Sequence, residues 1–240
     1  TYLVKSILEH AGHKVGLVGT IEAVIGQEHI PANNTTPESY VLQEYFAKMV
    51  EAGCDTVVME VSSQGLMLHR TQGFVFDYGI FTNIEPDHIG PNEHASFEEY
   101  MLEHKDFADY MHCKGLLFKQ CRVGIVNCDD AHYQDVIRDH TCKIETFGFA
   151  ENADYRAQDL KLISGAGFLG IDFKARGKVN LDIELHAPGR FSVYNALCAI
   201  AICNHFGVTA DEVKEALLQA HVKGRIELVK VSDVFTLMID

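Results

Sequence analysis

Three clusters of polar side chains directly follow runs of apolar, mostly β-branched residues, and their chemistry suits a metal ion. The clusters are Glu60-Val61-Ser62-Ser63, Glu85-Pro86-Asp87-His88 and Asp129-Asp130. In open α/β sheets, ligands bind beyond the carboxyl ends of the strands, and carboxylate and imidazole groups there suit Mg²⁺ or Mn²⁺. Glu60 and His88, which follow consecutive strands, are therefore candidate metal ligands. The alternative is that polar residues simply begin loops at these positions.

Two lysines lie in a nearly duplicated segment, in which FEEYMLEHK at 97–105 is echoed by FADYMHCK at 107–114. On a continuous helix the spacing of Lys105 and Lys114 corresponds to about 900°, so the two lysines face opposite sides. Lys114 shares its stripe with Tyr110 and other apolar residues. Desolvation lowers a lysine pKa and leaves a nucleophilic amine, which can act as a base or add CO₂ to form an anionic carbamate. The alternative is a lysine whose stem covers a helix edge.

Two further segments could bind an anion. The run Asn33-Asn34-Thr35-Thr36 precedes a helix start in which Thr36 is the predicted N-cap and Pro37 the first helical residue. Helix N-termini attract carboxylate or phosphate, although the same residues would also serve as plain caps. The pair His69-Arg70 could bind an anion in a bidentate manner, or Arg70 could simply be solvated.

Alternating strands and helices must position these groups. Continuous apolar runs predict strands at 13–20, 56–63, 78–84, 122–128 and 143–149, and helical spacing predicts helices at 1–14, 37–53, 96–120, 130–140, 191–206 and 209–220. Alternating polar and apolar residues after 153 predict a small antiparallel patch. The predicted fold is α/β, with a mostly parallel sheet covered by helices on both faces, in one domain over residues 1–240.

Composition excludes several classes of partner. The chain has 240 residues, with 20 Lys and Arg against 34 Asp and Glu, for a net charge of −14. Nucleic acids and anionic membranes need a basic footprint, so neither is an expected partner. The seven cysteines form no CxxC pair and fit a reducing compartment, and no apolar run is long enough to span a membrane. We expect a cytoplasmic monomer that binds small molecules.

In this order, the clusters resemble the central domain of the muramyl (Mur) ligases, in particular the type that adds the third amino acid to UDP-N-acetylmuramoyl-L-alanyl-D-glutamate. The likeness covers essentially the whole chain. The later motifs also resemble folylpolyglutamate synthetases. The residues that carry the likeness are VGLVGT at 15–20, NTTPES at 34–39, MEVSSQGL at 59–66, HR at 69–70, DH at 87–88, YMHCKGLLF at 110–118, APGRFSVYNALCA at 187–199, GRIE at 224–227 and Asp240.

The resemblance implies roles for individual residues and a P-loop NTPase-like fold. Glu60, His88 and a carbamylated Lys114 would hold Mg²⁺ and act in catalysis. The implied reaction is ATP-dependent: the D-glutamate carboxylate becomes an acyl phosphate, and the amine of L-lysine or meso-diaminopimelate displaces phosphate to form an amide in peptidoglycan precursor synthesis. Asn34, Thr35, Thr36, Ser62 and Arg70 would contact UDP-muramyl-dipeptide, and Asn195, Arg225 and Asp240 would bind ATP.

The chain also departs from the family pattern. The stretch between His88 and Lys114 is longer than usual, which keeps Lys105 as a second candidate for the modified lysine. No GxxxxGK[ST] phosphate loop is present; in the family it would end just before Thr1, and the amino-acid-binding domain would follow Asp240. We therefore expect a truncated central domain that is inactive alone.

Three alternative functions stay open at this point. A folylpolyglutamate-type ligase would share the ATP chemistry but take a different acceptor. A non-catalytic muramyl-peptide-binding module would keep the substrate contacts and lack ATP chemistry. A metal-dependent phosphoester hydrolase would use Glu60, Asp87, His88 and Asp130 without ATP.

Overall fold

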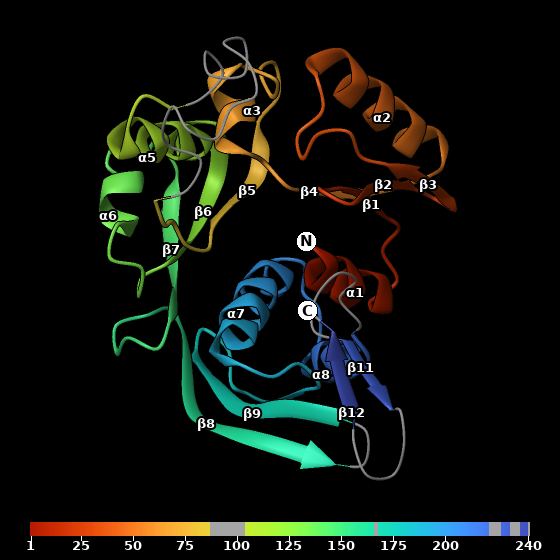
Figure 1. Cartoon of the computed structure of the whole chain (residues 1–240), viewed down its shortest axis with the longest axis vertical. Coiled ribbons are helices and arrows are strands. Elements are labelled where there is room, and N and C mark those ends of the chain that lie inside the picture. Colours follow the sequence, from red (N-terminus) through yellow and green to blue (C-terminus); the bar gives the residue numbers. More distant parts are fainter. Residues whose placement is uncertain (87–103, 166–167, 221–226, 231–235, 240) are drawn as a thin grey trace. The chain divides into compact units, whose positions relative to one another are not determined.

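Helices and strands alternate along the chain as the sequence predicts, and the predicted α/β class is confirmed. The computed structural model describes residues 1–86, 104–165, 168–220, 227–230 and 236–239 (Figure 1). Its contacts divide the chain into two units. Unit 1 contains Thr1 and Lys14–Glu145, and unit 2 contains Tyr2–His13 and Thr146–Asp240.

The first sheet of unit 1 has the strand order β3-β2-β1-β4. Its strands are β1 (Val15–Val18), β2 (Glu22–Ile25), β3 (Glu28–Pro31) and β4 (Thr56–Met59). β1 and β4 are parallel, as predicted from their apolar runs, whereas β2 and β3 add an antiparallel hairpin that was not predicted. Helix α2 (Ser39–Glu51) covers one face of this sheet (Figure 1), and Leu42 and Met49 pack there against Val18 and Ile25.

The predicted start of α2 is wrong by two residues. Thr36 was expected to cap the helix, but Glu38 occupies the N-cap position, and its side chain makes no capping hydrogen bond. Thr36 is fully buried instead, and its hydroxyl bonds to the backbone after β4. The end of the helix agrees with the prediction, because Gly53 follows it at a φ of 77°.

Unit 1 also contains β5 (Phe76–Phe81), β6 (Cys121–Asn127) and the first residues of β7 (Lys143–Gly148), in the order β5-β6-β7. The parallel strands thus fall in two sheets within this unit. The helices here are α3 (Ser63–Met67), α5 (Phe107–Gly115), the 3₁₀ helix η1 (Leu116–Lys119) and α6 (Tyr133–Val136). Tyr110 and Phe118 pack against Phe81, Val126 and Val136 to form the core.

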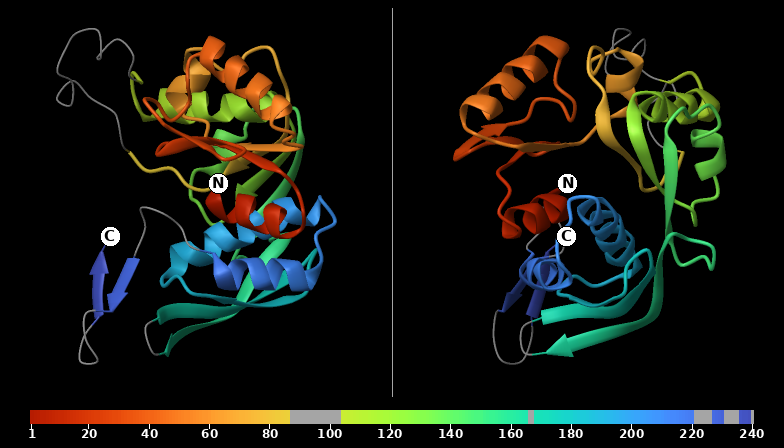
Figure 2. Two further views of the ribbon diagram at one scale, coloured as in Figure 1. Left: turned by 90° about the vertical axis from the view of Figure 1, so that its right-hand side faces the viewer. Right: turned by 180° about the vertical axis from the view of Figure 1, so that it is seen from behind.

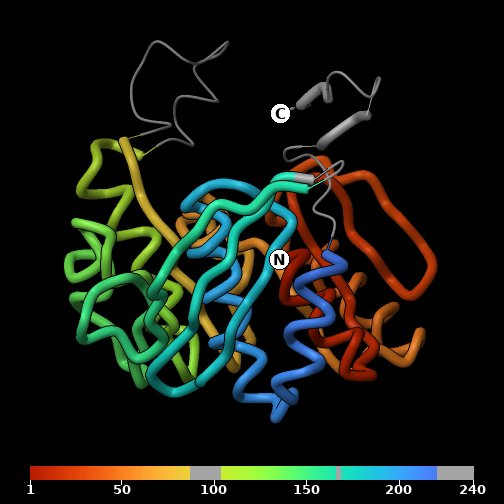
Figure 3. Tube along the Cα trace, turned by 90° about the horizontal axis from the view of Figure 1, so that it is seen from below, coloured from red at the N-terminus to blue at the C-terminus, as the bar shows by residue number. Residues whose placement is uncertain are grey.

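Unit 2 contains the predicted antiparallel patch. The last residues of β7 pair in parallel with β8 (Tyr155–Gly165), and β8, β9 (Phe168–Gly177) and β10 (Leu181–Leu185) are antiparallel. Figure 3 shows β8 and β9 running side by side. The sequence GAGFLG at 165–170 matches G-x-G-x-x-G, but it joins two antiparallel strands and no helix follows it, so it lacks the context of a dinucleotide-binding turn. Strands β11 (Glu227–Lys230) and β12 (Thr236–Ile239) form a separate antiparallel pair.

Helix α7 (Arg190–Asn204) is the centre of unit 2. It packs against β8 and β9, and α1 (Tyr2–His10) packs against both α7 and α8 (Ala210–Gln219), as Figure 2 shows. Buried residues run almost without a break from Val193 to Cys203. With 15 residues α7 is shorter than the roughly 20 that cross a bilayer. None of the helices in the described part of the chain is long and apolar enough to do so.

Candidate active site at the carboxyl ends of β1 and β4

Glu60 is held where two parallel strands end. Val18 of β1 lies opposite Met59 of β4, so the residues that follow the two strands meet. Oε2 of Glu60 accepts hydrogen bonds from the Thr20 backbone N–H at 3.0 Å and from Thr20 Oγ1 at 2.5 Å. Oε1 accepts a hydrogen bond from Thr1 Oγ1 at 2.9 Å. The predicted position of Glu60 at a sheet edge is thus what the structure shows.

The hydrogen bonds to Glu60 also control its charge. Burial raises the pKa of this carboxyl, but the opposing hydrogen bonds from Thr20 and Thr1 help to keep the pKa below its usual value. Glu60 is therefore ionised at neutral pH. An anionic carboxylate with threonine hydroxyls beside it is an oxygen donor set of the kind that Mg²⁺ takes, so the described residues fit this metal. Asp87 and His88 lie outside the described residues.

Thr20 was missed by the sequence analysis, although it ends the VGLVGT run that was identified. Its position after a predicted parallel strand could have identified Thr20 in the sequence. Thr20 follows β1 after one intervening residue, Gly19, and Glu60 directly follows β4, the parallel partner of β1. Parallel neighbours bring the residues after their carboxyl ends together. The hydroxyl of Thr20 also lies 3.1 Å from that of Thr35, which links the predicted substrate-binding run to the same edge.

Thr36 connects this run to the residues after β4. Its hydroxyl donates to the Glu60 carbonyl oxygen at 3.1 Å and accepts from the Ser62 N–H at 2.8 Å. Ser62 in turn caps α3, because its Oγ accepts from the Gly65 N–H at 2.9 Å. A Cβ at Gly65 would lie 2.8 Å from the Cβ of Thr36, so only glycine allows this close approach. Thr36 and Ser62 hold the backbone around Glu60 in place.

Arg70 completes the network from the far end of α3. His69 adopts a left-handed conformation, with φ at 58°, and the Arg70 N–H bonds back to the Gly65 carbonyl, which turns Arg70 inward. Its Nη1 donates to the Thr36 carbonyl at 3.1 Å, and its Nη2 lies 2.6 Å from Glu38 Oε1. Only 8% of Arg70 is exposed. Its Nε is buried without a hydrogen-bond partner among the described residues. The Arg70 guanidinium is therefore a buried cation held by the protein, and the solvated alternative is wrong.

Replacing Thr36 by valine should destabilise the protein by about 2 kcal/mol, because an isosteric methyl group leaves the Ser62 N–H and the Glu60 carbonyl without this partner. Thr35→Val is the matched control. It removes one hydroxyl contact at a partly exposed position and should change stability by less than about 0.5 kcal/mol. Urea unfolding of both variants measures the difference. Equal midpoints would contradict a structural role for Thr36.

Lys114 lies among apolar groups on α5, as its helical stripe predicts. Its Nζ is 4.8 Å from the centroid of the Tyr110 ring. Burial lowers the pKa of Lys114, which increases the fraction of neutral amine. Lys105, the second candidate, is exposed just before the helix, and its backbone N–H donates to Asp109 Oδ2 at 3.1 Å. The structure thus gives the two lysines different environments.

The remaining predicted site residues lie in other segments of the chain. Asn34 is exposed in the loop after β3, and Asn195 is exposed on α7 in unit 2. Arg225 and Asp240 lie outside the described residues. Asp130 uses both carboxylate oxygens on backbone N–H groups, those of Ile84 at 3.0 Å and His132 at 2.8 Å. This arrangement suits a loop-forming residue more than a metal ligand of a hydrolase.

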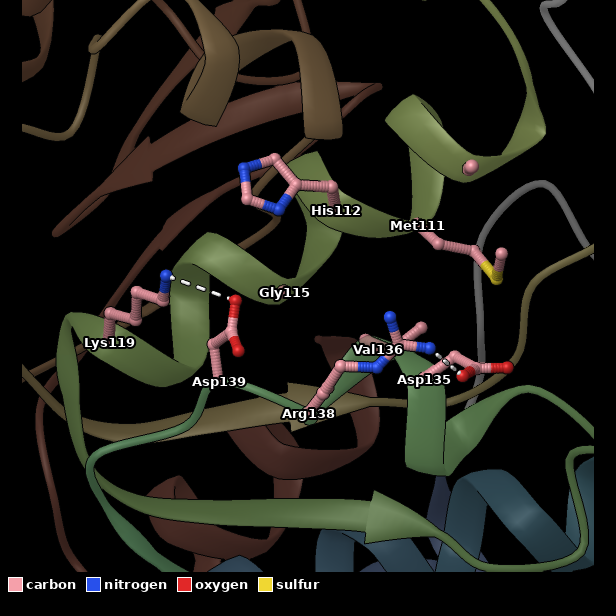
Figure 4. A pocket seen from close by; sticks show the side chains of 9 residues that line it. Met111, His112, Gly115, Lys119, Asp135, Val136, Arg138 and Asp139 are labelled. Carbon is pink, nitrogen blue, oxygen red and sulfur yellow. Dashed lines mark hydrogen bonds and ion pairs between the residues drawn. The ribbon is translucent and has the colours of Figure 1, made fainter.

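A pocket of about 170 Å³ lies between α5 and α6 (Figure 4). Its charged side chains are paired with one another, Lys119 with Asp139 at 3.5 Å and Arg138 with Asp135. None of the predicted site residues lines it. The pocket therefore adds no candidate for the chemistry at Glu60 and Lys114.

The chain is similar to known proteins over nearly its whole length. A ligase of Clostridium acetobutylicum, named UDP-N-acetylmuramoyl-L-alanyl-D-glutamate--2,6-diaminopimelate ligase 1, is 40% identical over 231 residues, 95% of this chain and 45% of that protein. A diaminopimelate ligase of Caldanaerobacter subterraneus subsp. tengcongensis is 40% identical over 242 aligned positions, 100% of this chain and 47% of that protein. The chain thus spans about half the length of the curated relatives it matches.

A solved structure of a UDP-N-acetylmuramoyl-L-alanyl-D-glutamate--2,6-diaminopimelate ligase shares the fold. Its TM-score is 0.76 at 21% identity, over 97% of this chain and 46% of that one. The profile of the Mur ligase middle domain family matches residues 1–203. The match includes both Glu60 and Lys114. The chain therefore belongs to the Mur ligase middle domain family.

Proposed function

We propose that this chain is the central part of an ATP-dependent ligase that joins 2,6-diaminopimelate to UDP-N-acetylmuramoyl-L-alanyl-D-glutamate. The observation that carries the proposal is the 40% identity, over nearly the whole chain, to two proteins named for that reaction. Phosphoryl transfer to a carboxylate needs charge stabilisation more than covalent chemistry. Ionised Glu60 and desolvated Lys114 support the proposal, because the carboxylate and a carbamate formed on the lysine would hold the Mg²⁺ that supplies this stabilisation. In the proposed protein, parts that precede and follow this chain complete the enzyme.

The proposed reaction has two steps. The D-glutamate carboxylate attacks the γ-phosphorus of ATP, which releases ADP and leaves an acyl phosphate. The amine of diaminopimelate then attacks the acyl carbon, phosphate leaves with the bonding electrons, and the new amide nitrogen loses a proton. Mg²⁺, when bound, supplies positive charge that stabilises the transferring phosphoryl group.

In this scheme Glu60, His88 and Lys114 hold the metal, and each must be anionic or neutral to do so. Glu60 is anionic because its pKa is lowered. Lys114 becomes anionic by carbamylation: its neutral amine attacks the carbon of CO₂, and the nitrogen gives a proton to solvent. The lowered pKa of Lys114 favours this reaction at neutral pH.

The residues proposed to bind substrates form two sets, one for UDP-muramyl-dipeptide and one for ATP. Arg70 offers a buried positive charge for an anionic part of UDP-muramyl-dipeptide, and Asn34 and Thr35 offer polar groups in the loop before α2. Thr36 and Ser62 act by positioning the backbone of this edge. We assign Asn195, Arg225 and Asp240 to ATP. The seven free cysteines support a reducing, cytoplasmic location.

A direct ligation assay tests the proposal. The full-length protein is incubated with ATP and UDP-N-acetylmuramoyl-L-alanyl-D-glutamate, with 2,6-diaminopimelate or L-lysine as the amine, and ADP and the ligated product are measured. We expect one ADP per product and a kcat/KM for diaminopimelate at least about 10²-fold above that for L-lysine. A preference for L-lysine would overturn the assigned amine. Ligation of glutamate to a folate, or binding without ATP turnover, would overturn the assigned reaction.

A further inference from the structure

Helix α5 and the residues before it bring together three side chains that the proposed function does not use. Among the described residues, one donor atom each of His104, Asp109 and Cys113 lie within 4.8 Å of one another. Asp109 and Cys113 are four positions apart on α5 and therefore share one helix face. His104 lies three residues before Phe107, the first residue of the helix, with its Nδ1 3.7 Å from Asp109 Oδ2. All three belong to the nearly duplicated stretch at 97–114.

Nitrogen, oxygen and sulfur donors from His, Asp and Cys are the ligands of zinc sites. We propose that His104, Asp109 and Cys113 bind one Zn²⁺ ion, which ties α5 to the residues before it. Bonds of about 2.0–2.3 Å place the ligands of a tetrahedral zinc about 3.5 Å apart. The three donors need to approach one another by about an ångström, which changes in side-chain torsions can supply.

The hydrogen bonds around these side chains are of the kind that orient metal ligands. His104 is 6% exposed, and its Nε2 lies 2.8 Å from the Oγ of Ser63, a buried residue of α3. In the tautomer with the proton on Nε2, this contact is a hydrogen bond to Ser63, and Nδ1 faces Asp109 with its lone pair. Metal-binding histidines almost always donate their second ring N–H in this way. The Lys105 N–H orients Asp109 in turn, through a 3.1 Å hydrogen bond.

The types of the ligands and the burial of Cys113 and His104 favour a metal that binds thiolate, such as zinc, over Mg²⁺. Cys113 is 4% exposed, and His104 stacks on Tyr110 with ring centroids 4.9 Å apart. A sulfur and an imidazole nitrogen are poor ligands for Mg²⁺, which prefers oxygen. On binding, the Cys113 thiol gives its proton to solvent and the thiolate forms the bond to zinc. Three protein ligands leave a fourth position for water.

Cobalt and zinc titrations of the metal-stripped chain test the proposal, in excess Mg²⁺ so that oxygen sites are filled. We expect one Co²⁺ to bind with a thiolate-to-metal absorption band that zinc abolishes. Cys113→Ala should remove the band, and both Cys113→Ala and His104→Gln should weaken zinc binding, measured by competition with a coloured chelator, by at least about 10-fold. Ser63→Ala should weaken zinc binding less and keep the band.

Cys198→Ala is the matched control, because Cys198 is a thiol of similar burial on α7, outside this group of ligands. It should keep both the band and the zinc affinity. A band that survives in Cys113→Ala, or zinc affinities equal in the wild-type chain and both ligand variants, would overturn the proposal. Should Cys113→Ala fail to fold, Asp109→Asn provides the same zinc comparison. Because the assay involves no ligation, its outcome is independent of the proposed ligase activity.

Discussion

Replacing Lys114 by methionine is expected to lower ligation by the full-length protein by at least about 10²-fold, as loss of a transition-state contact does. Methionine keeps an unbranched apolar stem in the half-buried site over Tyr110 but cannot form a carbamate. The kcat should fall more than KM rises, and CO₂-rich buffer should not restore it. Lys105→Met, at the exposed lysine of the same segment, should retain activity. Loss in Lys105→Met alone would move the modified lysine to position 105.

A measurement that does not depend on activity checks the same residue. In buffer with ¹³C-labelled bicarbonate, NMR should show a carbamate carbon in the wild-type chain and in Lys105→Met, but not in Lys114→Met. Burial lowers the pKa of Lys114, so CO₂ should add to it at a lower pH than to solvent-exposed lysines. A signal that persists in Lys114→Met would refute carbamylation at this position.

The parallel strands could be predicted because each is a short apolar run with polar residues after it. Val15–Val18 and Cys121–Asn127 were placed to within two residues on this ground. The hairpin Glu22–Pro31 was not predicted, because its residues alternate weakly and β3 is mostly exposed. A strand with few buried side chains leaves little periodicity in the sequence.

Most members of the polar network were predicted, with Thr20 as an exception, but its connections were not. Thr36 was placed at a helix start by local capping rules, whereas its hydroxyl bonds to Glu60 and Ser62, more than twenty residues away. Local rules cannot anticipate a partner that only the tertiary fold supplies, and burial then overrides the capping preference. The contact of His104 with Ser63 is of the same kind, across 41 positions.

Glu60 and Lys114 could be predicted because their signals are local. A carboxylate directly after a buried strand is placed at the sheet edge by strand geometry alone. A lysine on an apolar stripe is placed near the core by the helical period. Their charge states depend on neighbours. Thr20, which helps to hold the pKa of Glu60 down, becomes a neighbour only through the register of β1 and β4.

Replacing Glu60 by glutamine is expected to reduce ligation by about 10²–10³-fold and to raise the Mg²⁺ concentration needed for half-maximal activity. The amide has nearly the shape of the carboxylate, and its oxygen can still accept the Thr20 N–H, so the fold should persist. The substitution removes the negative charge that attracts Mg²⁺. Glu51→Gln, the same change at an exposed position near the end of α2, should leave both quantities unchanged.

The difference in stability between the wild-type chain and Glu60→Gln should also depend on pH. A carboxyl whose pKa is lower in the folded than in the unfolded state stabilises the fold above its unfolded pKa, and this contribution is lost as pH falls through the folded pKa. Because the pKa of Glu60 is lowered, the wild-type chain should exceed Glu60→Gln in stability at neutral pH, and the gap should close in acid. Urea unfolding at neutral and acidic pH measures the gap. If it were constant with pH while ligation was lost, the charge of Glu60 would act on the metal alone, and Thr20 would not help to keep it ionised.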